Sequence, residues 1–323
     1  MDILDIYLKS QTHKTLLSDI QSGMLSHAYL LECSDSFILE NYVYLMAKEI
    51  CCIGENTPCN TCINCQKIDH SNMVDLAIYP KSDKGIVVDD INEIVVDAYI
   101  RPIENEYKIY ILNNFDLATT QAQNKILKTL EEPPYNVVFI LSCSNSSLVL
   151  PTIISRTKRI CEPLLDISVV DEYLSGLKIA DSSTIASISG GNISIANKLT
   201  KGGEAKKIVD LAVETLVGLK SSADLLSYSS RILALKKDIP FFIDTLISIF
   251  RDSLVVGSNG DIKFKAYSSQ ISQISLIYSS SAIFKIVEKL IEIHNKLEFN
   301  CNINGIVDKM LLDILEVRFL CQK

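Results

Sequence analysis

Short apolar runs alternate with longer amphipathic stretches in the first half of the chain. The runs at residues 28–31, 76–78, 108–112 and 137–141 carry almost no polar side chains. Apolar runs of this kind are typical of strands buried on both faces, and the helical stretches between them supply the covering layers. The pattern therefore predicts an α/β domain built on a mostly parallel sheet.

One helix of this half is predicted over residues 117–130. It should end at Glu131-Glu132-Pro133-Pro134, because proline cannot continue a helical turn. The apolar positions change their spacing after about residue 163. We therefore place the end of the α/β domain at residue 163.

The second half of the chain shows helical periodicity without strand-like alternation. Residues 164–200 read as short helices interrupted at Ser189-Gly190-Gly191-Asn192, and residues 201–204 read as a linker. Beyond residue 205 apolar side chains recur with a period of about 3.6, as they do at Ile306, Met310, Ile314 and Val317. We expect a small helical domain over residues 164–203 and a terminal helical bundle over residues 204–323.

Composition and charge indicate which classes of protein this chain can belong to. Of the 323 residues, 48% are apolar, and the net charge is -8. An acidic chain is a poor match for a large basic groove around nucleic acid. The stretch Met1-Asp2-Ile3-Leu4-Asp5 has acids where a signal peptide needs basic residues. We expect a soluble cytoplasmic protein with no membrane segment.

A cluster of cysteines is the first candidate site. Cys51 and Cys52 are followed by Cys59, Cys62 and Cys65. In a reducing compartment closely spaced cysteines bind metal more often than they form disulfides, and four thiolates suit a structural Zn²⁺ site. We favour Cys52 as the first ligand, with Cys51 as the alternative. Free thiols, a redox pair and an iron–sulfur cluster are the competing interpretations.

A phosphate-binding loop is missing after the first predicted strand. Such a loop needs G-x-x-x-x-G-K-[ST], whose glycines admit the phosphates and whose lysine neutralises them. Residues 32–40 read ECSDSFILE and contain neither glycine nor lysine. ATP binding in the usual manner is therefore not expected.

The acidic half of an ATPase site is also missing. Carboxylates that hold Mg²⁺ and polarise water should follow the strand at residues 108–112, but Asn113 and Asn114 stand there. Asp116 comes two residues later, and we expect it to cap the following helix. No intrinsic ATPase activity is predicted.

Several stretches, taken in order, resemble one protein family. They are Ser26-His27-Ala28-Tyr29-Leu30-Leu31, the cysteine cluster, Lys108-Ile109-Tyr110-Ile111-Leu112, the run from Gln121 to Pro134, and the run from Leu150 to Thr157. Together they resemble the clamp-loader subunits of bacterial DNA polymerase III over roughly residues 10–165. The helical remainder is compatible with the same family.

The resemblance implies an AAA+ architecture. It implies a RecA-like parallel sheet with a zinc module inserted at about residues 51–66, an all-helical lid and a helical collar that oligomerises. The altered nucleotide loop is similar to that of the family's non-hydrolysing subunit. The implied partners are the gamma/tau and delta subunits of the DNA-directed DNA polymerase III holoenzyme. Contact with the sliding clamp and primer-template DNA is implied through the complex.

The resemblance also assigns a role to Arg156. In the family a Ser-Arg-Cys motif supplies an arginine finger to the nucleotide of a neighbouring subunit, a task that suits the fixed guanidinium fork. Ser155 and Arg156 match the motif, whereas Thr157 replaces its cysteine. A solvated surface position would be the plainer interpretation of a lone arginine, but in this motif we favour the role toward a neighbouring subunit.

Two other functions remain open from the sequence. A divergent gamma/tau-like motor ATPase would need an unusual phosphate loop. An unrelated zinc-stabilised interaction protein would leave the order of the strand, helix and arginine motifs unexplained. Residues 190–196 carry no basic side chain that could sense nucleotide from the lid, which favours a subunit without its own nucleotide.

Overall fold

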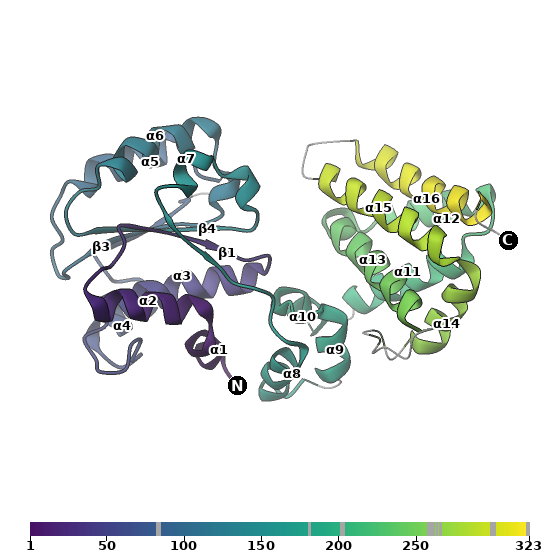
Figure 1. Cartoon of the computed structure of the whole chain (residues 1–323), viewed down its shortest axis with the longest axis horizontal. Coiled ribbons are helices and arrows are strands. Elements are labelled where there is room, and N and C mark those ends of the chain that lie inside the picture. The colour runs from purple at the N-terminus through teal and green to yellow at the C-terminus, as the bar shows by residue number, and fades with distance from the viewer. Residues whose placement is uncertain are drawn as a thin grey trace. The chain divides into compact units, whose positions relative to one another are not determined.

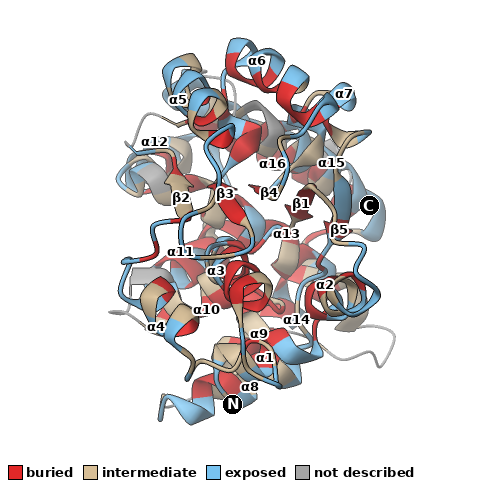
Figure 2. Cartoon of the chain, turned by 90° about the vertical axis from the view of Figure 1, so that its left-hand side faces the viewer, coloured by how far each residue is buried: buried red, intermediate tan, exposed pale blue. Residues whose placement is uncertain are grey.

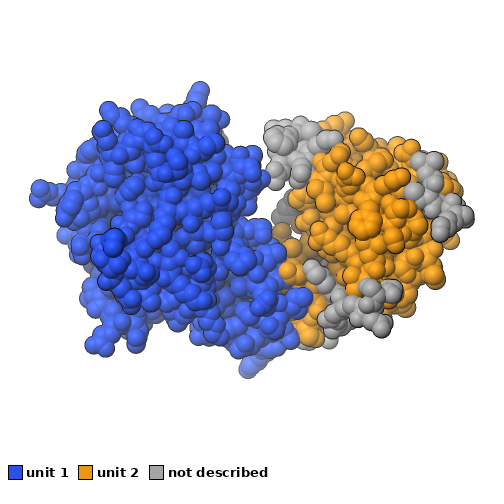
Figure 3. All heavy atoms as spheres, in the orientation of Figure 1, with its two compact units in different colours: residues 1–179, 191–194 blue, residues 180–190, 195–323 orange. Residues whose placement is uncertain are grey.

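The computed structural model describes residues 1–81, 85–179, 182–200, 204–256, 262, 264, 267–297 and 302–320. The chain divides into two compact units, Met1–Ile179 with Gly191–Ser194 and Ala180–Gly190 with Ile195–Lys323 (Figure 3). Residues 201–203 of the predicted linker lie outside the described residues. The predicted domain boundaries at residues 163 and 203 stay a prediction.

A five-stranded parallel sheet forms the centre of the first unit. Its strands are β1 (Ala28–Glu32), β2 (Leu76–Tyr79), β3 (Lys108–Leu112), β4 (Val137–Cys143) and β5 (Lys158–Cys161), in the spatial order β2-β3-β4-β1-β5. The first four confirm the predicted strands. β5 was not predicted, because only Ile160 of its four residues is buried and no apolar run marks it.

Helices cover both faces of this sheet (Figure 1). One face carries α5 (Val88–Ala98), α6 (Thr120–Glu131) and α7 (Pro151–Ile154), and the other carries α2 (Gln11–Ser22) and α3 (Ser36–Cys51). The helices α1 (Ile3–Lys9) and α4 (Ile63–Asp69) contact α3. The expected α/β fold, a parallel sheet with helices on both faces, is confirmed.

Burial on both faces explains why β1 reads as an unbroken apolar run. Successive side chains of a strand point to opposite faces. Ala28 and Leu30 join the hydrophobic cluster formed with α5 and α6, while Tyr29 and Leu31 are equally inaccessible to solvent. The central strands accordingly appear as buried in Figure 2.

The predicted helix over residues 117–130 starts later than expected. Residues Phe115–Leu117 form a 3₁₀ turn, η1, and α6 begins only at Thr120. The hydroxyl of Thr119 accepts a hydrogen bond from the Ala122 backbone N–H at 3.2 Å and so provides the N-cap. The helix ends at Glu131, directly before the two prolines, as predicted.

The remaining elements are helical, as the 3.6-residue period predicts. They are α8 (Ile167–Gly176), α9 (Ser182–Ser189), α10 (Ile193–Thr200), α11 (Glu204–Gly218), α12 (Ser222–Leu233), α13 (Ile239–Val255), α14 (Ser268–Ile277), α15 (Ser280–Leu297) and α16 (Ile303–Leu320), with 3₁₀ turns η2 (Ser146–Leu148) and η3 (Lys236–Asp238). Among the described residues, no helix is long and apolar enough to cross a membrane.

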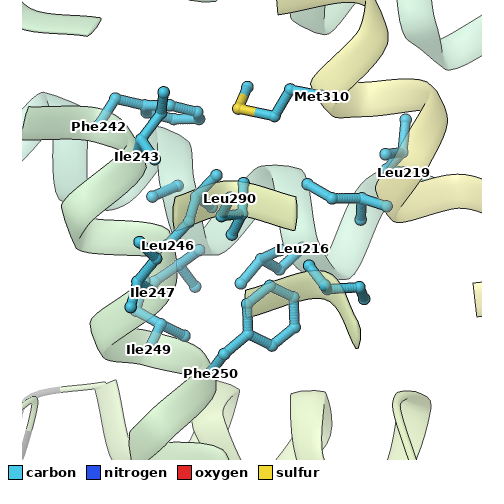
Figure 4. Packing of buried hydrophobic residues seen from close by; sticks show 14 of the residues in the cluster. Leu216, Leu219, Phe242, Ile243, Leu246, Ile247, Ile249, Phe250, Leu290 and Met310 are labelled. Atoms are coloured by element: carbon cyan, nitrogen blue, oxygen red, sulfur yellow. The ribbon is translucent and has the colours of Figure 1, made fainter. Parts of the chain in front are cut away.

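The core of the second unit is built around α13. Phe242, Leu246 and Phe250 of this helix are fully buried, and they belong to one cluster with Leu290 of α15 and Met310 of α16 (Figure 4). A helix that is apolar on most of its circumference must be surrounded by other helices. The neighbours α11, α14 and α15 supply that surrounding.

A close backbone approach requires glycine at position 191. Gly191 has a φ of +92°, and a Cβ placed there would lie 2.0 Å from the carbonyl oxygen of Leu165. We predict that Gly191→Ala lowers the free energy of unfolding by about 2–3 kcal/mol, through strain and steric clash.

Gly23→Ala provides the control for this prediction. Gly23 has a φ of +67° but open space around its Cα, so its substitution should cost only about 1 kcal/mol of conformational strain. Denaturant unfolding of both variants measures the difference. Equal losses would contradict the steric argument at Gly191.

Candidate functional site

Two helix ends carry the cysteine cluster. Cys52 is the C-cap of α3, and Cys62 is the N-cap of α4. Cys65 lies in the first turn of α4, and Cys59 lies in the connection between the two helices. This short connection thus returns the chain to the end of α3.

The four sulfurs of this cluster lie close together. The Sγ atoms of Cys52, Cys59, Cys62 and Cys65 are all within 4.8 Å of one another, and those of Cys59 and Cys65 are 4.0 Å apart. A tetrahedral Zn²⁺ with bonds of about 2.3 Å would set the sulfurs about 3.8 Å apart. The arrangement could therefore hold one metal ion, and its all-thiolate donor set suits zinc.

Backbone N–H groups already point at three of these sulfurs. Those of Gly54 and Cys59 donate to Cys52 Sγ at 3.4 Å, that of Cys62 donates to Cys59 Sγ at 3.2 Å, and that of Cys65 donates to Cys62 Sγ at 3.5 Å. Hydrogen bonds to sulfur favour the charged thiolate, which is the form that binds metal.

The thiol pKa values separate the cluster from Cys51. Hydrogen bonds from Thr61 lower the pKa of Cys59 to about 5, whereas burial raises the pKa of Cys51 to about 12. Burial also raises the pKa of Cys65, so charge alone does not select the ligands. Geometry favours the predicted choice of Cys52, because the Cys51 sulfur is outside the group of four.

The connection from β1 to α3 has no room for a phosphate loop. Only residues 33–35 separate the end of β1 at Glu32 from the start of α3 at Ser36. The phosphate-loop signature spans eight positions, with six from its first glycine to its second. Here Asp35 caps α3 directly, and its carboxylate accepts from the Phe37 backbone N–H at 2.9 Å.

Glu32, at the carboxyl end of β1, is paired within the chain. Its Oε2 accepts hydrogen bonds from Nε and Nη2 of Arg159 at 2.8 and 2.5 Å, and its Oε1 accepts from the Ser146 backbone N–H at 3.1 Å. Burial alone would raise the pKa of Glu32, but the hydrogen bonds from Ser146 and Arg159 hold it below its ordinary value. The carboxylate is therefore ionised and engaged in an ion pair.

Asp116 does not cap α6, contrary to the prediction. Its Oδ2 accepts from the backbone N–H groups of Ser144 and Asn145 at 3.0 and 3.1 Å and from the Ser144 hydroxyl at 2.7 Å. Thr119 provides the cap because the 3₁₀ turn η1 places Asp116 one turn too early. Asp116 thus ties the loop after β3 to the loop after β4.

Arg156 follows the C-cap of α7, a helix that lies on the opposite face of the sheet from α3 and α4 (Figure 1). Its Nη1 donates to the Thr152 carbonyl at 2.8 Å and to the Ser155 hydroxyl at 3.2 Å. Its Nη2 lies 2.7 Å from Glu131 Oε1 at the end of α6, and about a third of its side chain is exposed (34%). The guanidinium is thus held near the surface, away from the cysteine cluster.

Sequence reasoning missed three groups near these sites. They are Asp35, the Glu32–Arg159 pair and Glu131 as the partner of Arg156. An N-cap signal was available for Asp35, because an aspartate directly precedes the apolar periodicity of α3. Glu32 and Arg159 are 127 positions apart in the sequence, and Glu131 and Arg156 are 25 apart. No local sequence pattern predicts either ion pair.

Comparison with known proteins shows which proteins this chain resembles. Residues 8–162 match the family model described as "DNA polymerase III, delta subunit". The chain is 25% identical to DNA polymerase III subunit delta' of Bacillus subtilis over 326 aligned residues, which cover 96% of this chain and 97% of that relative. It is 24% identical to subunit tau of the same organism, over 91% of this chain and 58% of that relative.

A solved structure was also matched. The gamma subunit-related protein of Thermotoga maritima aligns with 95% of this chain and 99% of that one, at 18% identity and a TM-score of 0.49.

The parallel sheet, the helical remainder and the inserted cysteine cluster are the features expected of an AAA+ protein of the clamp-loader type. Within that class the chain resembles the delta-prime subunit of bacterial DNA polymerase III. The resemblance expected from the sequence is confirmed.

Proposed function

We propose that this chain is a non-hydrolysing, delta-prime-like subunit of the DNA polymerase III clamp loader. In this role it helps to load the sliding clamp on primed DNA and supplies Arg156 to the nucleotide site of a neighbouring motor subunit. One observation carries the proposal: the loop that would bind nucleotide phosphates is shortened to three residues, while Arg156 is kept at an exposed helix end.

The chemistry after β1 and β3 supports the absence of ATP hydrolysis. No glycine or lysine is available between residues 32 and 40, and Asn113 and Asn114 cannot replace Mg²⁺-binding carboxylates. The acids that remain nearby, Glu32 and Asp116, are occupied by Arg159 and by the loop after β4. Neither is free to polarise a water.

The surroundings of Arg156 support its availability to a partner. Its ion pair with Glu131 joins two partly exposed side chains, and such pairs are worth only about 0.2–1 kcal/mol. A phosphate group, with its higher charge, competes well with one carboxylate for a guanidinium. Arg156 can therefore leave Glu131 for a nucleotide presented by a neighbour at little cost.

Zinc belongs to the proposal as a structural ion. Cys52, Cys59, Cys62 and Cys65 would hold it, and a closed set of four thiolates leaves no open position for catalysis. When bound, the ion would fix the end of α3 to the start of α4. The cluster lies on the other face of the sheet from α7, so its role would be to stabilise the module.

The proposed lid, collar, partners and cellular location rest on the resemblance to clamp-loader subunits. We propose residues 164–203 as the lid and residues 204–323 as the collar through which gamma/tau and delta subunits assemble. Contact with the sliding clamp and primer-template DNA would occur through the complex. A replication subunit of this kind would act in the cytoplasm.

A divergent motor ATPase is the second candidate. It is favoured by the alignment with subunit tau, which extends over 91% of this chain. ATP turnover by the isolated chain separates the two candidates directly, because only a motor subunit hydrolyses ATP without a partner.

We predict that Arg156→Ala lowers the ATP turnover of a motor subunit reconstituted with this chain, the delta subunit, clamp and primed DNA. Loss of an arginine finger lowers the rate of ATP hydrolysis at the affected site by about 10³-fold or more. Total turnover should therefore fall by the fraction that this one site contributes. Steady-state phosphate release measures it. Arg156→Lys should rescue little, since lysine lacks the planar fork.

Glu131→Gln provides the matched control, because it removes the partner of Arg156 in the free chain and keeps the arginine. It should leave turnover unchanged or raise it slightly. Gel filtration shows whether each variant assembles. Unchanged turnover with assembled Arg156→Ala, or ATP hydrolysis by the isolated chain, would falsify the proposed role.

We predict that Cys52→Ser removes bound zinc and lowers the melting temperature, whereas Cys51→Ser retains zinc. A structural zinc site contributes to the free energy of folding, so loss of one of four thiolates lowers both the affinity for zinc and the stability of the fold. Metal content by mass spectrometry, with melting curves before and after chelation, measures the effect. Zinc loss in Cys51→Ser with retention in Cys52→Ser would reverse the ligand assignment.

A further inference from the structure

Asp35 occupies an unusual position between β1 and α3. Its side chain is completely buried. Its Oδ1 accepts hydrogen bonds from the backbone N–H groups of Phe37 at 2.9 Å and Ile38 at 3.4 Å, in the first turn of α3. To this extent Asp35 is an ordinary N-cap.

The same carboxylate also caps a second helix, 158 residues further along the chain. Its Oδ2 accepts from the Ile193 N–H at 2.5 Å, and its Oδ1 accepts from the Ser194 N–H at 3.2 Å. Ile193 and Ser194 are the first two residues of α10, and they belong to the same compact unit as Asp35. One carboxylate thus satisfies four backbone donors from two helix N-termini.

Side chains around Asp35 reinforce this junction. The hydroxyls of Ser36 and Ser194 lie 2.7 Å apart, and Ser194 Oγ also accepts from the Phe37 N–H at 3.0 Å. The amide of Asn192 donates to the Ser34 carbonyl at 3.4 Å. The start of α3 and residues 192–194 are therefore joined by reciprocal contacts on both sides of the carboxylate.

Backbone amides alone balance the charge of Asp35. Within the described part of the chain, no lysine, arginine or histidine forms an ion pair with it. A buried anion held by helix N-termini and main-chain N–H groups is the arrangement by which proteins bind phosphate. The helix that directly follows β1 is, moreover, the one whose N-terminus would face nucleotide phosphates in a phosphate-loop protein.

We propose that Asp35 is an internal substitute for a nucleotide phosphate. Its carboxylate fills the anion position between the N-termini of α3 and α10, so residues 191–194 stay attached to the α/β core without any bound nucleotide. The inference rests on the proposed function in one respect, since it takes the connection after β1 as the place of a missing phosphate loop.

This arrangement also explains how the position is closed to ligands. A phosphate entering it would meet a carboxylate of the same charge and would find four of the N–H donors already engaged. The lack of a basic residue over residues 190–196 is consistent with this, because a fixed internal anion needs no mobile cation to sense it. The Asp35 side chain thus both excludes phosphate from this position and attaches residues 191–194 to the α/β core.

Hydrogen exchange on the isolated chain tests the proposal. We expect Asp35→Ala and Asp35→Asn to speed amide exchange in two separate peptides, one with Phe37 and Ile38 and one with Ile193 and Ser194. The melting temperature of Asp35→Ala should fall by about 5 °C or more. Asp2→Ala is the control, because Asp2 caps only α1, through the Asp5 N–H at 2.8 Å.

Chemical rescue supplies the second measurement. Formate has the size of the carboxylate that Asp35→Ala removes, so sodium formate should raise the melting temperature of this variant more than equal sodium chloride does. It should not do so for the wild-type chain or for Asp2→Ala. Asp35→Asn keeps the shape and loses the charge, so it reports the effect of charge even if Asp35→Ala does not fold.

Two outcomes would overturn the inference. If only the Phe37–Ile38 peptide exchanges faster in the Asp35 variants, Asp35 is an ordinary cap of α3. If formate stabilises wild type and Asp35→Ala equally, no anion position has been vacated. Because the isolated chain suffices for both measurements, failure here leaves the test of Arg156 with motor subunits unaffected.

Discussion

All five strands of the sheet run in the same direction, and this arrangement determines where the polar groups of the first unit meet. The carboxyl ends of parallel strands meet at one edge, so residues that are far apart in sequence are brought together there. β1 pairs with β4 on one side and β5 on the other, with Glu32 opposite both Cys143 and Cys161. A shift of register by one residue would turn the apolar side chains of β1 to the wrong faces and displace Glu32 from Arg159.

The polar groups at this edge satisfy one another. Burying a charge is costly unless it is paired or hydrogen-bonded. Arg159 pairs with Glu32, and the amides after β4 bind Asp116. An edge that could surround phosphates is therefore neutralised by the chain itself. Glu32 and Asp116 thus both have partners within the chain, which supports the proposed absence of ATP hydrolysis together with the missing glycines.

Features of the structure that depend on local sequence patterns could be predicted from the sequence. Four buried strands and the cysteine spacing were visible because apolar runs and ligand intervals are local. β5 could not be predicted, because three of its four side chains are not buried and form no apolar run. The role of Asp116 was misassigned because both the 3₁₀ turn before α6 and the partners after β4 depend on tertiary contacts. The local sequence at Asp35 fits one helix cap, which was overlooked, and nothing local indicates the second helix, 158 residues away.

Arg156 and Asp35 differ in a way that matters for the proposed role. Arg156 is partly exposed and held by one carboxylate and neutral oxygens, so an incoming anion can exchange with Glu131. Asp35 is inaccessible and bound by four main-chain donors, of which the Phe37 N–H is shared with Ser194 Oγ. Buried hydrogen bonds to a charge are far harder to replace than a surface ion pair. This difference fits the proposed function, in which Arg156 would respond to a neighbour's nucleotide while the position of Asp35 would bind none.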